Sequence, residues 1–101
     1  MPKSRAIDPS KFRDNPKQIT KYLNAALSTG DAAKITKAIG DMIRAQGMSR
    51  FAEKVGLRRE GLYRSFRGQV APGFDTVINV LLALNVQLTA RPSGHALKKS
   101  R

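Results

Sequence analysis

The sequence predicts an all-α fold of five helices followed by a short β-strand. Three observations lead to this prediction. Apolar residues recur at helical spacing in five successive segments, and each of these segments ends at a glycine or a polar turn. A later segment alternates apolar and polar residues with the period of a strand. The chain has 101 residues, of which 41 % are hydrophobic, enough for one domain with a modest core.

Residues 1–14 are predicted to form a basic, turn-rich arm. Asp8 is followed by Pro9 and Ser10, a sequence that favours a turn and discourages a helix before it. Phe12 is the main apolar residue of this arm, so we expect it to anchor the arm to the domain of residues 15–90.

The first two helices are predicted over residues 16–27 and 32–46. Asn15 and Asp31 are suitable N-caps, and both segments carry one apolar stripe at helical spacing. Gly40 lies inside the second helix, where glycine costs about 1 kcal/mol relative to alanine. The compensation that we expect is a close approach by a neighbouring helix. Gly47 then ends the segment.

A short third helix is predicted from Ser49, a good N-cap, to Gly56, and a fourth from Arg59 to Phe66. After a loop over residues 67–73, a fifth helix is predicted from Phe74 to Leu84. Its inward stripe is expected to consist of Phe74, Val77, Ile78 and Leu81, widened by Val80 and Leu84.

The predicted strand contains Val86, Leu88 and Ala90, which alternate with polar residues. A lone strand leaves its backbone unpaired, and no other segment resembles a strand. We therefore expect these three residues to pair with a second copy across a two-fold axis, or with a strand of a partner. Residues 91–101 are predicted to be a basic, disordered tail.

The composition excludes several classes of protein. The chain has 19 Lys and Arg against 7 Asp and Glu, and its net charge of +12 favours polyanions, nucleic acid above all. Without cysteine it has no disulfides and no thiolate zinc site, which fits a reducing cytosol. No apolar run approaches the ~18–20 residues that span a bilayer, and the N-terminus lacks the apolar centre of a signal peptide. We expect a cytoplasmic, nucleoid-associated protein without membrane contact.

Catalysis is not expected. The single histidine, His95, lies in the polar tail, and the acidic residues are scattered without the spacing of an acid–base pair or a metal site. The prediction is therefore that the protein is not an enzyme and has no catalytic residues, metal, cofactor or small-molecule substrate.

The stretch from Met48 to Arg67 has the spacing of a helix-turn-helix motif. Counted from Met48, Phe51, Leu57 and Leu62 take the fourth, tenth and fifteenth places, which fill the wedge between the two helices. The small fifth residue is Ala52, and the ninth is Gly56, which can end a helix in a left-handed conformation. In this geometry the second helix projects and can enter a major groove of DNA.

The charges of this stretch agree with DNA binding, since residues 49–67 contain six Lys or Arg and two Glu. Arginine matches phosphates and guanine edges with two parallel hydrogen bonds. We expect two groups of contacts on double-stranded DNA. The base-reading residues are Arg58, Arg59, Glu60, Tyr63 and Arg64, and the phosphate-binding residues are Ser49, Arg50, Arg67 and Gly73.

These residues resemble the λ-repressor-like (Xre) helix-turn-helix family. Within that family the chain is similar to addiction-module antidote proteins, the antitoxins of type II toxin–antitoxin operons. The resemblance covers about residues 7–90 and is most specific at Gly40-Asp41, Gly47-Met48-Ser49 and Glu60-Gly61-Leu62-Tyr63. The carrying stretches are ITKYLNAALSTGD, AIGDMIRAQGMS, VGLRREGLY and FDTVINVLLALNVQL.

The resemblance implies a homodimer that binds operator DNA, represses its own operon and binds a toxin similar to the RelE/ParE fold. The sequence departs from the family at Arg58, where serine or threonine usually caps the recognition helix. Arg58 cannot cap, so water, backbone or a DNA phosphate must satisfy that helix end. Three alternatives remain open. They are a toxin-binding antitoxin with weak or auxiliary DNA binding, a stand-alone repressor of phage or plasmid type, and a general nucleic-acid-binding protein without a toxin partner.

Overall fold

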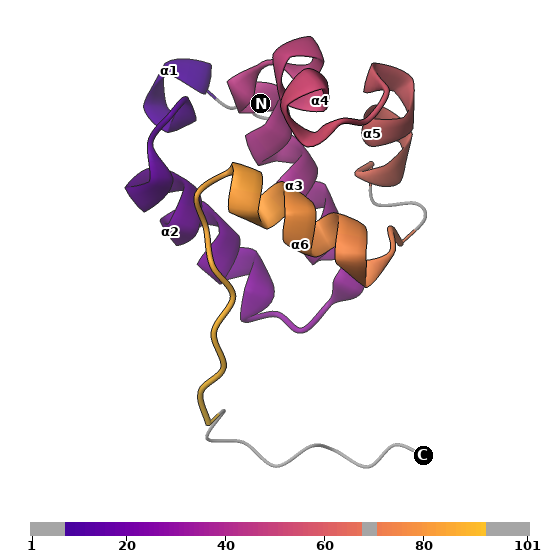
Figure 1. Cartoon of the computed structure of the whole chain (residues 1–101). Coiled ribbons are helices and arrows are strands. Elements are labelled where there is room, and N and C mark those ends of the chain that lie inside the picture. The colour runs from indigo at the N-terminus through magenta and orange to yellow at the C-terminus, as the bar shows by residue number, and fades with distance from the viewer. Residues whose placement is uncertain (1–7, 68–70, 93–101) are drawn as a thin grey trace, which may run out of the picture.

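The computed structural model describes residues 8–67 and 71–92, which contain six α-helices and no strand (Figure 1). The all-α class is therefore confirmed, but the number of helices is higher than predicted because a further helix precedes the expected five. In chain order the helices are α1 (Pro9–Phe12), α2 (Pro16–Leu27), α3 (Ala32–Gln46), α4 (Met48–Val55), α5 (Arg59–Ser65) and α6 (Phe74–Ala83).

The additional helix α1 lies where a turn-rich arm was predicted. Asp8 caps it, since its carboxylate accepts a hydrogen bond from the N–H of Ser10 at 3.1 Å, and Pro9 occupies the first helical position. Phe12 is buried and meets the ring of Tyr22 edge-on, with the centroids 5.5 Å apart. Residues 8–14 are thus packed on the domain, and the expected anchoring role of Phe12 is confirmed.

Helices α2 and α3 pack against each other with the caps that the sequence predicts. The side chain of Asn15 accepts from the N–H of Gln18 at 3.4 Å, and that of Asp31 from the N–H groups of Ala33 and Lys34. Helix α3 supplies much of the core. The buried apolar residues of these two helices are Ile19, Leu23, Ala38, Ile39, Met42, Ile43 and Ala45.

The short helix α4 follows α3, and glycines set both of its boundaries. Gly47, with φ +98°, separates α3 from α4 and takes the N-cap position of α4 without a side-chain cap. The prediction that Ser49 caps this helix is wrong, because α4 already begins at Met48 and Ser49 lies in its first turn. Gly56 ends α4 in the left-handed conformation, with φ +73°, as predicted.

Helix α6 completes the core with Val80 and Leu81, and Leu84, directly after the helix, is also buried. It ends like α4, since the N–H of Val86 donates to the carbonyl of Leu81 at 2.9 Å and Asn85 takes the left-handed position at φ +64°. The predicted inward stripe is wrong at Phe74, whose side chain is 71 % exposed.

The segment after α6 first passes along the helices and then extends beyond them, without strand pairing in the described residues (Figure 1). Val86 is buried in the core of its own chain, Leu88 is 39 % exposed and Ala90 is exposed. The side chain of Val86 is therefore not available to a partner, and a strand that includes Leu88 and Ala90 stays a prediction. Of the predicted tail, residues 93–101, including His95, lie outside the described residues.

Candidate nucleic-acid interface

Helices α4 and α5 form two separate helices joined by the turn Gly56–Arg58. The turn is fixed by two backbone hydrogen bonds: the N–H of Gly56 donates to the carbonyl of Glu53 at 3.2 Å, and that of Leu57 to the carbonyl of Ala52 at 2.9 Å. This pair is the Schellman motif, which needs a left-handed residue at Gly56. The sequence folds this way locally because glycine adopts that conformation without the Cβ penalty.

Buried apolar side chains hold the two helices in the domain. Phe51 and Ala52 of α4 and Leu62 of α5 are all at most 3 % exposed, and Phe66 is fully buried at the end of α5. Leu57, predicted to fill the wedge between the helices, is 39 % exposed and does so only in part. One side of α5 thus belongs to the core, and the other side is free to face a ligand.

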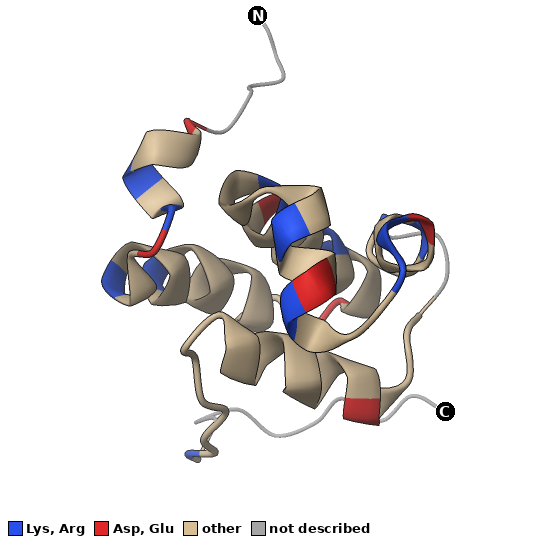
Figure 2. Ribbon diagram, turned by 45° about the horizontal axis from the view of Figure 1, so that its top comes forward, with Lys and Arg blue, Asp and Glu red and all other residues tan. Residues whose placement is uncertain are grey.

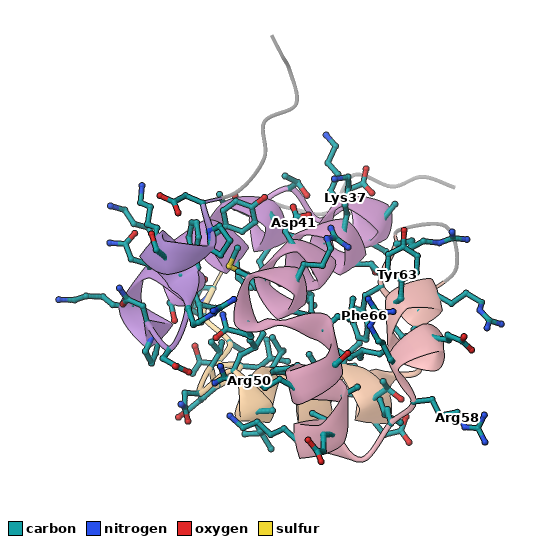
Figure 3. All side chains as sticks on the ribbon, turned by 90° about the horizontal axis from the view of Figure 1, so that it is seen from above. Lys37, Asp41, Arg50, Arg58, Tyr63 and Phe66 are labelled. Carbon is teal, nitrogen blue, oxygen red and sulfur yellow. The ribbon has the colours of Figure 1, made fainter. Side chains whose placement is uncertain are left out.

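The residues predicted to read bases come together on the free side of α5 and on the turn before it. All of them are exposed: Arg58, Arg59, Glu60, Tyr63 and Arg64. Arg58 takes the N-cap position without a side-chain hydrogen bond, as expected for an arginine. Figure 3 shows its side chain projecting away from the molecule beyond α5.

Tyr63 and Arg67 form a small unit on this surface. The Arg67 guanidinium lies over the Tyr63 ring, 5.5 Å from its centroid, and the tyrosine is 46 % exposed. The aromatic ring therefore carries a cation on its face, which places a predicted phosphate contact beside a predicted base contact.

The other predicted phosphate residues are more dispersed. Ser49 and Arg50 lie in the first turn of α4, and Gly73 is the N-cap of α6. All three are exposed, and they lie on α4 and α6 rather than on α5. In Figure 3 Arg50 lies on the opposite side of α4 from Arg58. A ligand that touched all of them would have to extend well beyond α5.

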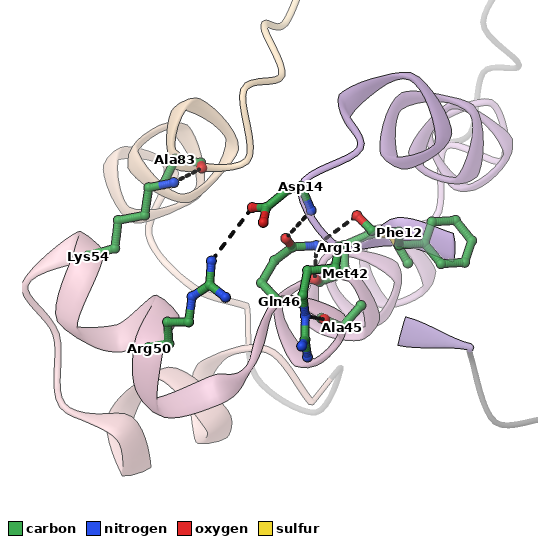
Figure 4. Close-up of polar contacts among 9 residues, drawn as sticks. All are labelled: Phe12, Arg13, Asp14, Met42, Ala45, Gln46, Arg50, Lys54 and Ala83. Carbon is green, nitrogen blue, oxygen red and sulfur yellow. Dashed lines mark hydrogen bonds and ion pairs between the residues drawn. The ribbon is translucent and has the colours of Figure 1, made fainter. Parts of the chain in front are cut away.

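Arg50 belongs to a polar cluster that sequence reasoning missed (Figure 4). Its Nη2 lies 3.6 Å from Oδ1 of Asp14, at the junction of α1 and α2. Asp14 has a left-handed backbone, with φ +52°, and its N–H donates to Oε1 of Gln46 at 2.9 Å. Both charged side chains remain more than half exposed. Nothing in the sequence spacing relates position 14 to position 50.

Gln46 is the buried centre of this cluster. Its Nε2 donates to the carbonyls of Phe12 at 3.1 Å and Met42 at 3.2 Å, so one side chain joins the end of α1 to the end of α3. Arg13 adds a second link, from its Nε to the carbonyl of Ala45 at 3.0 Å. These bonds hold Asp14 beside Arg50.

Helix α4 is also tied to α6. Nζ of Lys54 donates to the carbonyl of Ala83 at 2.9 Å, and Nδ2 of Asn79 reaches the carbonyl of Val55 at 3.5 Å. Lys54 is therefore a structural contact of the C-terminal end of α6, where a cation also complements the exposed carbonyls.

Ion pairs in the described part of the chain occur away from α5. Asp41 is approached by Arg44 and, at 3.9 Å, by Lys37, and it accepts a hydrogen bond from the hydroxyl of Tyr22 at 2.6 Å. The Arg50–Asp14 contact is the remaining ion pair among residues 8–67 and 71–92. The arginines at positions 58, 59 and 64 thus have no acidic partner in this part of the chain. Figure 2, in which Lys and Arg are blue, shows basic residues on α5 and also on α1, α2 and α4.

The described residues offer little else of chemical interest. They contain no cluster of His, Asp or Glu that could hold a metal ion. Within the same ranges no helix is both long and apolar enough to cross a membrane.

Comparison with known proteins identifies the family. Residues 3–92 match the family described as "Probable addiction module antidote protein". The chain belongs to this family. It is also 37 % identical over 90 residues to a protein of Haemophilus influenzae (strain ATCC 51907 / DSM 11121 / KW20 / Rd) named "Uncharacterized protein", covering 89 % of this chain and 93 % of that protein. No solved structure matches the chain.

Membership of the antidote family confirms the coarser part of the sequence-based expectations. An antidote of an addiction module counteracts a toxin, so membership implies a toxin partner of some kind. It also points to a regulatory rather than a catalytic protein. The family description does not name a ligand for the exposed arginines of α5.

Proposed function

We propose that this antidote is a sequence-specific repressor that binds double-stranded DNA through α4 and α5. The observation that carries the proposal is the exposed surface of α5 and of the turn before it, where Arg58, Arg59 and Arg64 have no acidic partner in the described residues, while Leu62 of the same helix is buried. A short helix with one buried and one basic side, preceded by a second helix and a tight turn, matches a helix-turn-helix of the λ-repressor-like (Xre) kind.

In this proposal α5 is the recognition helix. Arg58 and Arg59 enter the major groove first, with Glu60 beside them, and Tyr63 and Arg64 follow one turn later. Arginine pairs with the O6 and N7 atoms of guanine, and glutamate can accept from the amino group of cytosine. Ser49 and Arg50 from α4, Arg67 after α5 and the backbone of Gly73 contact phosphates on either side of the groove.

The proposal includes two protein partners. The antidote binds its operator as a homodimer, which places two recognition helices about one turn of DNA apart. It also binds a toxin similar to the RelE/ParE fold and represses the operon that encodes both proteins. The expected location is the cytoplasm, in contact with the nucleoid.

Selection of bound sequences from a random pool of duplex DNA tests the DNA-binding proposal. We expect an enriched site with two half-sites, and an affinity for that site that falls by about 0.9 log unit per log unit of salt for each neutralised phosphate. Lys34→Ala, which removes a cation from the first turn of α3, is the matched control for arginine variants of α5. Absence of any enriched site would contradict sequence-specific repression and favour a general nucleic-acid-binding protein.

Co-expression with the adjacent open reading frames tests the toxin partner. A small protein that copurifies with the antidote, and whose toxicity the antidote suppresses, is expected. If no neighbouring product binds, the stand-alone repressor is the better description.

A further inference from the structure

An apolar groove lies apart from the proposed base contacts, and none of its lining residues is a proposed DNA contact, although Gly73 lies between Pro72 and Phe74, which line it. It has a volume of about 280 Å³ and lies between α2, the first half of α3, α6 and the segment that follows α6. Its lining residues include Leu23, Leu27, Ile35, Phe74, Leu81 and Leu88, and none of its lining residues is charged. Thr36 supplies the one polar side chain among them.

The groove has exposed apolar edges. Phe74 is 71 % exposed, Leu88 39 % and Leu27 37 %, so three of the six large hydrophobic residues that are exposed in the described chain line this one site. Single exposed leucines are ordinary on a protein surface, but several around one hollow mark an interaction site. This concentration also explains why Phe74, predicted to be inward, is not buried within its own chain.

The charge distribution favours a second copy of the chain as the occupant. The sequence from Gly68 to Ala90 contains no Lys or Arg and a single acid, Asp75, in a chain of net charge +12. In Figure 2 the ribbon of α6 carries no blue segment. A strongly acidic or basic partner finds no complementary charge in this groove. Two copies of the chain repel each other elsewhere, and this is a surface on which they can meet without opposing cations.

We propose that two copies of the antidote associate through this groove, each covering the apolar edges of the other around a two-fold axis. Such a contact is self-complementary, because the same surface offers both a hollow and the protruding Phe74. It leaves the exposed arginines of α5 free in both copies, since none of them lines the groove. This inference rests on the proposed function in one respect only, namely that two copies bind one operator.

This contact differs from a dimer made by strand pairing. Val86 is buried and its N–H is already bonded to Leu81, so a strand can begin only after it. Phe74 lies outside that segment and lines the groove, whereas Ala90 lies inside that segment and does not line the groove. Substitutions at these two positions therefore separate the two modes of association.

Sedimentation velocity of the full chain without DNA tests the proposal. The wild type should form a dimer in the micromolar range, and its dimer dissociation constant should fall roughly threefold or more between low and high salt, because salt screens the repulsion and not the apolar contact. DNA binding has the opposite dependence on salt, which keeps the two properties apart.

Four variants complete the experiment. Phe74→Ser and Leu88→Lys should weaken the dimer roughly tenfold or more, through lost apolar contact and opposed charges. Leu57→Lys is the matched control, since Leu57 and Leu88 are both 39 % exposed and receive the same charge, and it should dimerise like the wild type. Ala90→Pro should also dimerise like the wild type. Circular dichroism checks that each variant is folded. Phe74 and Leu88 are substituted in separate variants, so that if one of them does not fold, the other still tests the proposal.

Two results would overturn the proposal. One is a wild type that stays monomeric at every salt and up to about 100 µM, which would leave the groove to another apolar partner such as the toxin. The other is a dimer that Ala90→Pro abolishes and Phe74→Ser does not affect. An intact dimer that selects no DNA sequence would instead contradict the proposed function and leave this inference standing.

Discussion

The carbonyl oxygen of Phe66 lies directly against Gly40, so that a Cβ atom built on residue 40 would sit 2.1 Å from it. Phe66 is the C-cap of α5 and Gly40 lies in the middle of α3. The end of the proposed recognition helix therefore rests on the backbone of the central helix. This contact explains a glycine inside a helix, because any side chain there would push α5 away.

Gly40→Ala should lower the free energy of unfolding by about 1–3 kcal/mol. The added methyl group meets a backbone oxygen, which cannot move as a flexible side chain can, and this overpacking exceeds the gain of about 1 kcal/mol in helix propensity. Urea unfolding followed by circular dichroism measures the change.

Gly61→Ala is the matched control for that experiment. Gly61 lies within α5, and a Cβ there would meet no atom within 4 Å. It should raise the free energy of unfolding by up to about 1 kcal/mol through helix propensity alone. Equal effects of the two substitutions would show that the contact between Gly40 and Phe66 has no energetic weight.

The fold was largely predictable because its helices carry local signals. Asn15 and Asp31 cap the helices that follow them, and Gly56 takes the left-handed position where its spacing predicted it. The errors arose where one local signal fits two structures. Asp8 followed by Pro9 suits a turn, but it equally suits an N-cap followed by the first helical residue, and α1 uses it in that way.

The candidate site was predictable only where it is contiguous in sequence. Helical spacing alone places Leu62 and Phe66 inside and Glu60 and Arg64 outside, so the exposed side of α5 follows from the sequence. The contacts of Gln46 and Asp14 join residues more than thirty positions apart, and no periodicity relates them. The exposure of Phe74 could not be found either, because an apolar stripe does not show whether its own chain covers it.

Gln46→Leu should detach α1 from α3. Leucine has a similar size, but it leaves the N–H of Asp14 and the carbonyl of Phe12 without their partner, and each unsatisfied buried group costs about 1–3 kcal/mol unless water reaches it. We expect a lower free energy of unfolding and faster trypsin cleavage at Arg13. Gln87→Leu, at an exposed glutamine after α6, should change neither property. Unchanged cleavage at Arg13 would show that Phe12 and the Arg13–Ala45 hydrogen bond hold α1 without Gln46.

Asp14→Asn should strengthen binding to every duplex DNA, roughly 2–5-fold at low salt. The carboxylate faces Arg50, and a phosphate at Arg50 would lie within a few ångströms of this negative charge, so its removal relieves a repulsion of at most about 1 kcal/mol. Asparagine tolerates the left-handed backbone of position 14 and keeps the N–H that Gln46 accepts.

Asp31→Asn provides the comparison for that variant, because it makes the same change of charge at the α2–α3 connection, far from α4 in Figure 1, and asparagine can still cap α3. Fluorescence anisotropy with labelled DNA measures both variants. If Asp31→Asn increases affinity as much as Asp14→Asn does, the effect is one of net charge, and Asp14 has no particular relation to the phosphate at Arg50.

Arg59→Ala and Arg50→Ala should both weaken DNA binding, but on different sets of DNA sequences. Arg59 lies at the start of α5, where the proposal places base edges, so its truncation should cost about 1–3 kcal/mol on the selected site and little on random duplex DNA. Arg50 is proposed to hold a phosphate, so its truncation should weaken both duplexes alike and reduce the slope of log affinity against log salt by about 0.9. Anisotropy titrations of both variants on both duplexes, over a range of salt, measure these quantities. Equal losses on the two duplexes for Arg59→Ala would remove Arg59 from the base-reading residues and shift the reading of sequence to Arg58, Glu60, Tyr63 and Arg64.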